Sequence, residues 1–260
     1  MYQVLPYIEQ ENLHQLRQGD GVNVGFIDTG LSEIRVPAFN CPSRSDRFAT
    51  IATDIYALGD YAGVLASWND GRWTRFEYQI TAPPMENPVT KETEDEVAWT
   101  GILVKGGQVN VSESPPRVWK FAKVDFAAIQ DGASNTILLA EKAAHADDYT
   151  ISSSSPWRHW EFWGYYTGAD WPIMRMFGAK ILGDASPNRE VAVRGDSEAR
   201  TGPFQNGKSI EFGFGSAHPG VLNAVFGDGS AHVLSSSADL LLLDQLGKRA
   251  DGSIATLEDL

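Results

Sequence analysis

His218 and Asp228 are the side chains near the C-terminus whose types and spacing could do chemistry. A histidine and an aspartate can together move a proton or hold a metal ion. The residues Leu222–Phe226 between them, however, repeat with a period of two, which predicts a β-strand. At about 3.3 Å per residue, an extended chain would hold the two side chains roughly 25–30 Å apart. We therefore interpret His218-Pro219-Gly220 as a turn and Asp228-Gly229 as the tip of a hairpin.

A second group of oxygen-bearing side chains could bind a cation. Asp131, Ser134 and Asn135 follow one another at the short spacing that calcium-binding loops use. The segment lacks the alternating acidic run and the terminal glutamate of an EF-hand, and an Asx-turn before a strand is the interpretation we favour. No cofactor is therefore expected. Calcium is the alternative, with Asp131, Asn135 and Asp228 as its candidate ligands.

The segment Trp157–Tyr166 is unusually aromatic and begins an aromatic-rich region at residues 157–177. Large aromatic rings can stack on sugars, and they can equally fill the space between two layers of a core. Carbohydrate binding or carbohydrate chemistry is therefore the alternative function for this chain, with a glycan as its partner. The candidate ligand-binding residues are Trp157, Trp160, Trp163 and Tyr165.

Common enzyme motifs are absent from the sequence, so we predict a protein that is not an enzyme and name no catalytic residue. The chain has no nucleophile elbow, no His-Glu-x-x-His pair, no Walker loop and no dinucleotide-binding glycine loop. Cys41 is the one cysteine, so no disulfide can close within the chain and no zinc site built on cysteines is expected. We interpret Cys41 as a small buried residue, because its neighbours do not indicate a nucleophile.

The composition of the chain limits which classes of partner and which cellular compartment we expect. The chain has 260 residues and a net charge of −13, and such a surface argues against nucleic-acid partners. No apolar run is long enough to span a membrane, so the sequence as it stands predicts a soluble protein. We expect a single domain over residues 1–260, with a proline-rich and acidic loop insertion at about 81–117.

Short helices and irregular strands are predicted to position these residues. Helices are expected at Pro6–Leu16 and at Ala238–Leu246. Strands are expected within Val36–Phe39, Tyr56–Trp68, Val118–Phe126, Thr136–Glu141 and Leu222–Leu234. These elements predict an α+β fold with a mostly antiparallel β-sheet, short flanking helices and long loops.

Four blocks of the sequence, taken in order, resemble one protein family. They are Leu5–Gln10 with Leu13, Phe39–Ser43, Asp131–Thr136 with Glu141-Lys142, and His218–Gly220 through Asp228–Ser230. Their order and spacing resemble the domain of unknown function 1559, the prepilin-type proteins of planctomycete-type bacteria that share a His-x9-Asp-Gly motif. The resemblance assigns a structural role to the motif residues Cys41, Pro42, Asp131, Gly132, Asn135, His218, Pro219, Gly220, Asp228 and Gly229.

The resemblance implies the head domain of a pilin-like or pseudopilin-like protein, located at the cell surface, in the envelope or in a periplasm-like compartment. Its partners would be other pilin-like subunits or envelope proteins, and its role would be structural rather than enzymatic. Family members begin with a prepilin leader and a long apolar helix, which this sequence lacks, so membrane attachment would depend on that missing helix. We therefore expect an exposed apolar groove near Leu5, Ile8 and Leu13.

Overall fold

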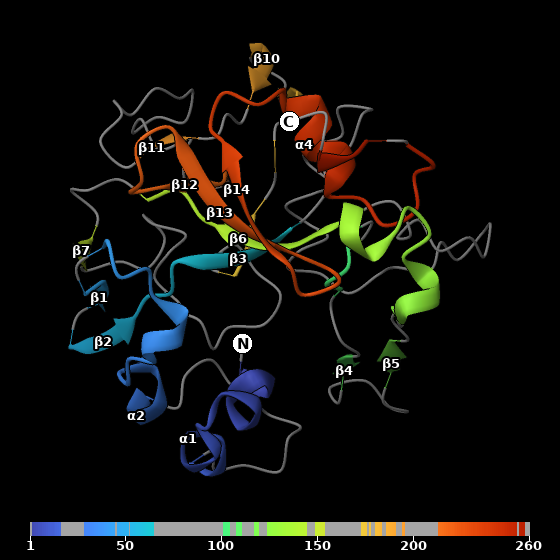
Figure 1. Cartoon of the computed structure of the whole chain (residues 1–260). Coiled ribbons are helices and arrows are strands. Elements are labelled where there is room, and N and C mark those ends of the chain that lie inside the picture. Colours follow the sequence, from blue (N-terminus) through green and yellow to red (C-terminus); the bar gives the residue numbers. More distant parts are fainter. Residues whose placement is uncertain are drawn as a thin grey trace.

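The computed structural model describes residues 2–16, 29–44, 46–51, 53–64, 101–104, 108–110, 117–119, 124–144, 149–153, 173–175, 177, 180–183, 186–190, 194–195, 213–253 and 255–257. Within these residues, short helices accompany small and mostly antiparallel sheets, which confirms the predicted α+β fold (Figure 1). Most of the loop insertion at 81–117 and the whole aromatic segment at 157–166 lie outside them. The binding residues proposed in the aromatic segment therefore remain predictions.

The largest sheet has five strands in the order β14-β13-β6-β3-β8. Neighbouring strands are antiparallel, except that β8 joins β3 in parallel at one edge. The strands are β3 (Tyr61–Val64), β6 (Ile137–Glu141), β8 (Met174–Arg175), β13 (Val221–Phe226) and β14 (Ala231–Ser235). The predicted hairpin and the predicted strand at Thr136–Glu141 are thus confirmed, and they lie side by side in the middle of the molecule (Figure 1).

The β13–β14 hairpin forms for the local reasons that its sequence suggests. Leu222, Ala224 and Phe226 are buried on one face of β13, and Asn223 is exposed on the other. The turn between the strands requires a residue in the left-handed region, and Gly229 supplies it with φ of +87°. The hairpin therefore presents an apolar face to the core.

The helix α4 (Leu240–Leu246) covers that core, as expected for the segment Ala238–Leu246. Asp239 caps the helix, because its carboxylate accepts hydrogen bonds from the N–H groups of Leu241 and Leu242. Leu243 and Leu246 pack in the same cluster of buried residues as the apolar face of β13. The remaining described members of this cluster come from β3, β6, β14, Phe177 and Phe214.

Smaller sheets complete the described structure. One has three strands in the order β2-β1-β7, formed by β1 (Phe48–Ile51), β2 (Asp54–Ala57) and β7 (Thr150–Ser153). The two-stranded pairs are β4 (Gln108–Asn110) with β5 (Arg117–Trp119), β9 (Lys180–Gly183) with β10 (Ser186–Glu190), and β11 (Arg194–Gly195) with β12 (Gly215–Ser216). Short helical segments also occur: α2 (Thr29–Ser32), and the 3-10 turns η3 (Phe126–Ala128) and η4 (Ala133–Asn135).

The N-terminal segment differs from the single helix predicted at Pro6–Leu16. It forms a 3-10 helix, η1 (Tyr2–Ile8), and a separate α-helix, α1 (Glu11–Gln15). Glu9 separates the two helices with φ of +59°, a conformation that no α-helix contains. The proline at position 6 lies inside η1 and disfavours a continuous α-helix through this point.

The exposed apolar groove expected near Leu5, Ile8 and Leu13 is a wrong prediction. Leu5 and Leu13 are buried in a second cluster of apolar residues, and Ile8 packs against it. A 3-10 helix repeats every three residues, so Leu5 and Ile8 share its inner face. Exposed apolar side chains of this helix include Val4 and Tyr7, which lie on another face.

Other predicted strands were wrong in type or in length. Val36–Phe39 contains the 3-10 turn η2 (Pro37–Phe39), because proline is well suited to the first position of a helical turn. Tyr56–Trp68 contributes to β2 and then to β3, which belong to different sheets, and its residues 65–68 lie outside the described part. Val118–Phe126 begins within β5 and ends at Phe126, which belongs to η3 and not to a strand, and its residues 120–123 lie outside the described part. In the described part of the chain, no helix is long and apolar enough to cross a membrane.

Candidate functional site

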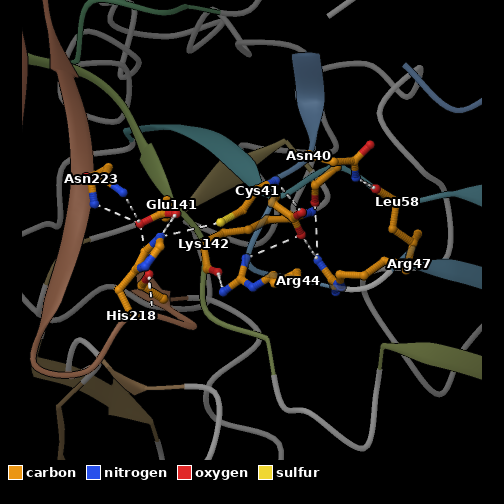
Figure 2. A network of polar contacts seen from close by, with 12 residues as sticks. Asn40, Cys41, Arg44, Arg47, Leu58, Glu141, Lys142, His218 and Asn223 are labelled. Atoms are coloured by element: carbon orange, nitrogen blue, oxygen red, sulfur yellow. Dashed lines mark hydrogen bonds and ion pairs between the residues drawn. The ribbon is translucent and has the colours of Figure 1, made fainter. Parts of the chain in front are cut away.

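Cys41, Glu141 and His218 come together from distant positions in the sequence (Figure 2). Each offers one ligand atom, and these atoms all lie within 4.8 Å of one another. Cys41 Sγ is 3.5 Å from His218 Nε2. Glu141 Oε1 is 3.3 Å from the same nitrogen. We refer to these residues as the Cys41–Glu141–His218 cluster.

Each member of the cluster lies at the end of a helix or strand or in the turn next to one. Cys41 begins the turn after η2, Glu141 is the last residue of β6, and His218 lies in the turn before β13. The turn at His218 is fixed by its backbone N–H, which donates to Ser216 Oγ at 3.0 Å. The pairing of β6 with β13 brings the carboxylate of Glu141 next to Asn223, beyond that turn.

The carboxylate of Glu141 is fully buried, and its two oxygens have different surroundings. Oε2 accepts hydrogen bonds from Ser216 Oγ at 2.8 Å, Asn223 N at 2.8 Å and Asn223 Nδ2 at 3.2 Å. Among the described residues, Oε1 has no hydrogen-bond partner, and the nearby ring nitrogen is His218 Nε2 at 3.3 Å. The strands thus hold one oxygen in place and direct the other into the cluster.

The electrostatics of the cluster keep Cys41 protonated in the absence of a bound cation. Burial raises the pKa of the Cys41 thiol above its ordinary value, against the opposing effect of the Ser43 backbone N–H. The Glu141 carboxylate adds to the rise, and the Arg44 guanidinium opposes it. A thiol that keeps its proton at neutral pH is a weak nucleophile. A metal ion would displace this proton, because the thiolate is the form that binds metals.

The geometry differs from that of a proton relay. In a relay, the carboxylate holds one ring nitrogen of the histidine and the nucleophile faces the other nitrogen. Here Cys41 Sγ and Glu141 Oε1 both face Nε2 of His218. Three atoms that converge on one small volume resemble a ligand set more closely than a relay.

A buried ionic network supports the cluster from the side of Cys41. Asp60 accepts a hydrogen bond from the Cys41 backbone N–H at 2.8 Å and from Arg47 Nη1 at 2.8 Å. Arg44 Nη1 lies 3.3 Å from the same carboxylate, and Arg44 Nη2 donates to the carbonyl oxygen of Lys142 at 2.9 Å. Burial acts to raise the pKa of Asp60, but the Arg47 and Arg44 guanidinium groups outweigh it and lower that pKa. The network therefore connects the turn at Cys41 to the end of β6 (Figure 2).

The residues proposed as calcium ligands make contacts within the fold. Asp131 accepts hydrogen bonds from the backbone N–H groups of Asp251, at 2.7 Å, and Gly252, at 3.1 Å. Asn135 Nδ2 donates to the carbonyl oxygen of Asp131 at 3.3 Å. Asp228 lies at the hairpin tip, where Oδ1 accepts from the N–H and the hydroxyl of Ser230. Calcium binding at these positions stays a prediction.

The other motif residues lie in turns. Gly132 has φ of +96° and Gly220 has φ of +71°, conformations that side chains other than glycine rarely adopt. Pro42 and Pro219 are exposed in the turns next to Cys41 and His218. His218 and Asp228 stand before and after β13 rather than close together. The turn and hairpin interpretation of these two residues agrees with where they lie.

Sequence reasoning did not bring the cluster together. It treated Cys41 as a small buried residue and His218 as part of a turn, and it did not consider Glu141 as a ligand. Two signals were available. Each of the three residues lies in a different one of the four family blocks. Glu141 also places a charge at the end of an apolar strand, where a buried carboxylate needs a specific partner.

Comparison with known proteins gives one result. The model of the family described as "Protein of unknown function (DUF1559)" matches residues 1–241. This match confirms the resemblance that the four blocks predicted. No curated protein and no solved structure matches the chain.

Proposed function

The chain belongs to the DUF1559 family, and from this premise we propose that it is the non-enzymatic head domain of a pilin-like or pseudopilin-like envelope protein. Its task is structural. The head associates with other pilin-like subunits or with envelope proteins, and its loops face the surroundings.

The observation that carries this proposal is the use that the fold makes of the motif residues. Asp131 connects the segment before β6 to the C-terminal segment, through backbone N–H groups of Asp251 and Gly252. Asp228 stabilises the tip of the central hairpin. Gly132, Gly220 and Gly229 supply turns with positive φ. A family motif whose residues form turns and close hairpins is typical of a scaffold.

The exposed side chains and the aromatic segment are relevant to the alternative function, which is carbohydrate binding. In the described part of the chain, the exposed large apolar side chains include Val4, Tyr7 and Phe126. Single exposed apolar residues are common on protein surfaces, so these residues favour neither function by themselves. The residues that would support carbohydrate binding lie outside the described part, so that function stays a prediction.

Localisation and assembly test the proposal together. Antibodies against the purified protein would follow it through fractionation of cells that carry the gene, alongside cytoplasmic and envelope marker proteins. We expect the protein in the envelope fraction, and we expect chemical cross-linking of intact cells to give species of higher mass. A protein that follows the cytoplasmic marker and stays monomeric after cross-linking would overturn the proposal.

A further inference from the structure

We propose that the Cys41–Glu141–His218 cluster is a binding site for a divalent transition-metal ion, with Zn²⁺ as the ion that fits best. The proposed ligand atoms are Cys41 Sγ, Glu141 Oε1 and His218 Nε2 (Figure 2). The site adds a metal to the structural role proposed above and does not depend on it.

The distances agree with metal coordination. With metal–sulfur, metal–nitrogen and metal–oxygen bonds of about 2.3, 2.0 and 2.1 Å, a tetrahedral ion would hold sulfur and nitrogen about 3.5 Å apart and nitrogen and oxygen about 3.4 Å apart. The corresponding distances are 3.5 Å for Cys41 Sγ to His218 Nε2 and 3.3 Å for His218 Nε2 to Glu141 Oε1. The third pair, Cys41 Sγ and Glu141 Oε1, lies within 4.8 Å, so two of the three ligand distances already match those of a bound ion.

The surroundings of Glu141 provide an independent observation. Within the described part of the chain, its Oε1 atom is buried without a hydrogen-bond partner, with His218 Nε2 at 3.3 Å, whereas Oε2 accepts three hydrogen bonds. An acceptor left in this state costs free energy unless something else satisfies it. Hydrogen bonds to the outer oxygen of a carboxylate are what orients a metal ligand. The unsatisfied oxygen is thus aimed at the position that the ion would occupy.

The charge and the chemical type of the ligand atoms indicate which ion the site would bind. A thiolate and an imidazole are ligands for zinc and its neighbours, whereas calcium and magnesium prefer sites made of oxygen atoms. The thiolate of Cys41 and the carboxylate of Glu141 would together neutralise a divalent ion in this buried place. The His218 side chain is 30% exposed, so the site has a route to solvent, and a water molecule would be the fourth ligand of a tetrahedral ion.

The consequence for the molecule is a connection between three segments that are far apart in the sequence. The turn after η2, the end of β6 and the turn before β13 would share one ion. Binding should therefore stabilise the whole folded chain, because the site is assembled only when these elements have come together.

Cobalt binding to chelator-treated protein provides the sharpest test. Co²⁺ occupies zinc sites, and a thiolate ligand gives it an intense charge-transfer absorption in the near ultraviolet. Cys41 is the only cysteine in the sequence, so this band would assign the ligand without any variant. We expect one equivalent of Co²⁺ to produce the band, visible bands typical of tetrahedral coordination, and loss of both on addition of Zn²⁺. Absence of the thiolate band in folded protein would overturn the proposal.

Variants then test the other ligands. Affinity for Zn²⁺, measured by competition with a chromophoric chelator, should fall by about 100-fold or more in Cys41→Ser, Glu141→Gln and His218→Gln. His232→Gln is the matched control, because His232 is a histidine of the neighbouring strand β14 that lies outside the cluster. His218→Gln keeps the backbone hydrogen bond to Ser216, so it should fold even if Glu141→Gln does not. Unchanged affinity in folded His218→Gln would also overturn the proposal.

Discussion

At the scale of single residues, Asp60 is the acceptor that holds together the buried ionic network next to the cluster. Its carboxylate is buried with the Arg44 and Arg47 guanidinium groups. Removing one partner of a buried ion pair leaves buried charge uncompensated, which costs about 3–5 kcal/mol. We therefore expect Asp60→Ala to lower the free energy of unfolding by about this amount, as measured by denaturant unfolding.

A matched control for Asp60 is available on the surface. Asp46 pairs with Arg35, and the two side chains are 60% and 33% exposed. An exposed pair contributes about 1 kcal/mol or less, so Asp46→Ala should change the unfolding midpoint only slightly. Equal losses of unfolding free energy in Asp46→Ala and Asp60→Ala would show that the buried network stabilises the fold no more than an exposed ion pair does.

Asp228 should give the hairpin a measurable pH dependence. Hydrogen bonds from the Ser230 hydroxyl and backbone N–H lower the pKa of Asp228 below its ordinary value. A carboxyl group with a lowered pKa stabilises the folded state above its unfolded pKa of about 4, and this contribution disappears as the pH falls through the folded pKa. We expect the wild type to melt at a higher temperature than Asp228→Asn at pH about 7, and the difference to shrink at pH about 3.

The hydroxyl group provides the control for this pH effect. Ser230→Ala removes the hydrogen bond that lowers the pKa of Asp228 most, the one from the Ser230 hydroxyl, and leaves the carboxyl group in place. The melting temperature of this variant should therefore depend less on pH than that of the wild type. A difference between the wild type and Asp228→Asn that is the same at both pH values would contradict the assignment.

At the scale of elements, α4 depends on its cap. Asp239 accepts hydrogen bonds from two N–H groups of the first turn, at 2.9 and 3.1 Å. Loss of such a cap costs about 1 kcal/mol. Asp239→Ala should therefore lower the free energy of unfolding by about 1 kcal/mol, whereas Asp239→Asn, which keeps an acceptor, should lower it less. A loss of similar size in both variants would point to charge rather than capping.

The elements that the sequence predicted correctly are those with local causes. The β13–β14 hairpin has an alternating strand and a glycine turn, and α4 has a leucine-rich face and an aspartate at its start. The segments predicted wrongly contain local signals that compete with the predicted element, such as the proline that begins η2. At the end of the segment Val118–Phe126, the Asp125 carboxylate caps the turn η3 by accepting a hydrogen bond from the N–H of Ala128, so the predicted strand does not include Phe126.

The candidate site could not be predicted from local pattern, because no two of its ligand residues share an element. Cys41 and His218 are separated by 177 positions and meet only through the folded sheet. The sequence shows that a cysteine, a glutamate and a histidine are available as ligands, and it places each of them in one of the family blocks. The convergence of these residues is a property of the pairing of β13 with β6, which lies between residues far apart in the chain.

At the scale of the whole molecule, the net charge governs how the heads can associate. The chain has a net charge of −13, so two copies repel each other at separations up to about the Debye length of the solution. Assembly of such heads requires that this repulsion be screened or that cations lie between them. Self-association should therefore increase when the ionic strength rises from about 0.02 M to about 0.5 M, a range in which the Debye length falls several-fold.

Sedimentation velocity at several protein concentrations would measure this dependence. Sodium and magnesium chloride, compared at equal ionic strength, separate the two ways in which salt can act. An equal increase in association with both salts would indicate screening of the net charge, because screening depends on ionic strength. A larger increase with magnesium would indicate cations held between acidic surfaces. Association that is greatest at low salt would contradict both, and it would show that attraction between opposite charges on the two copies exceeds the repulsion of their net charge.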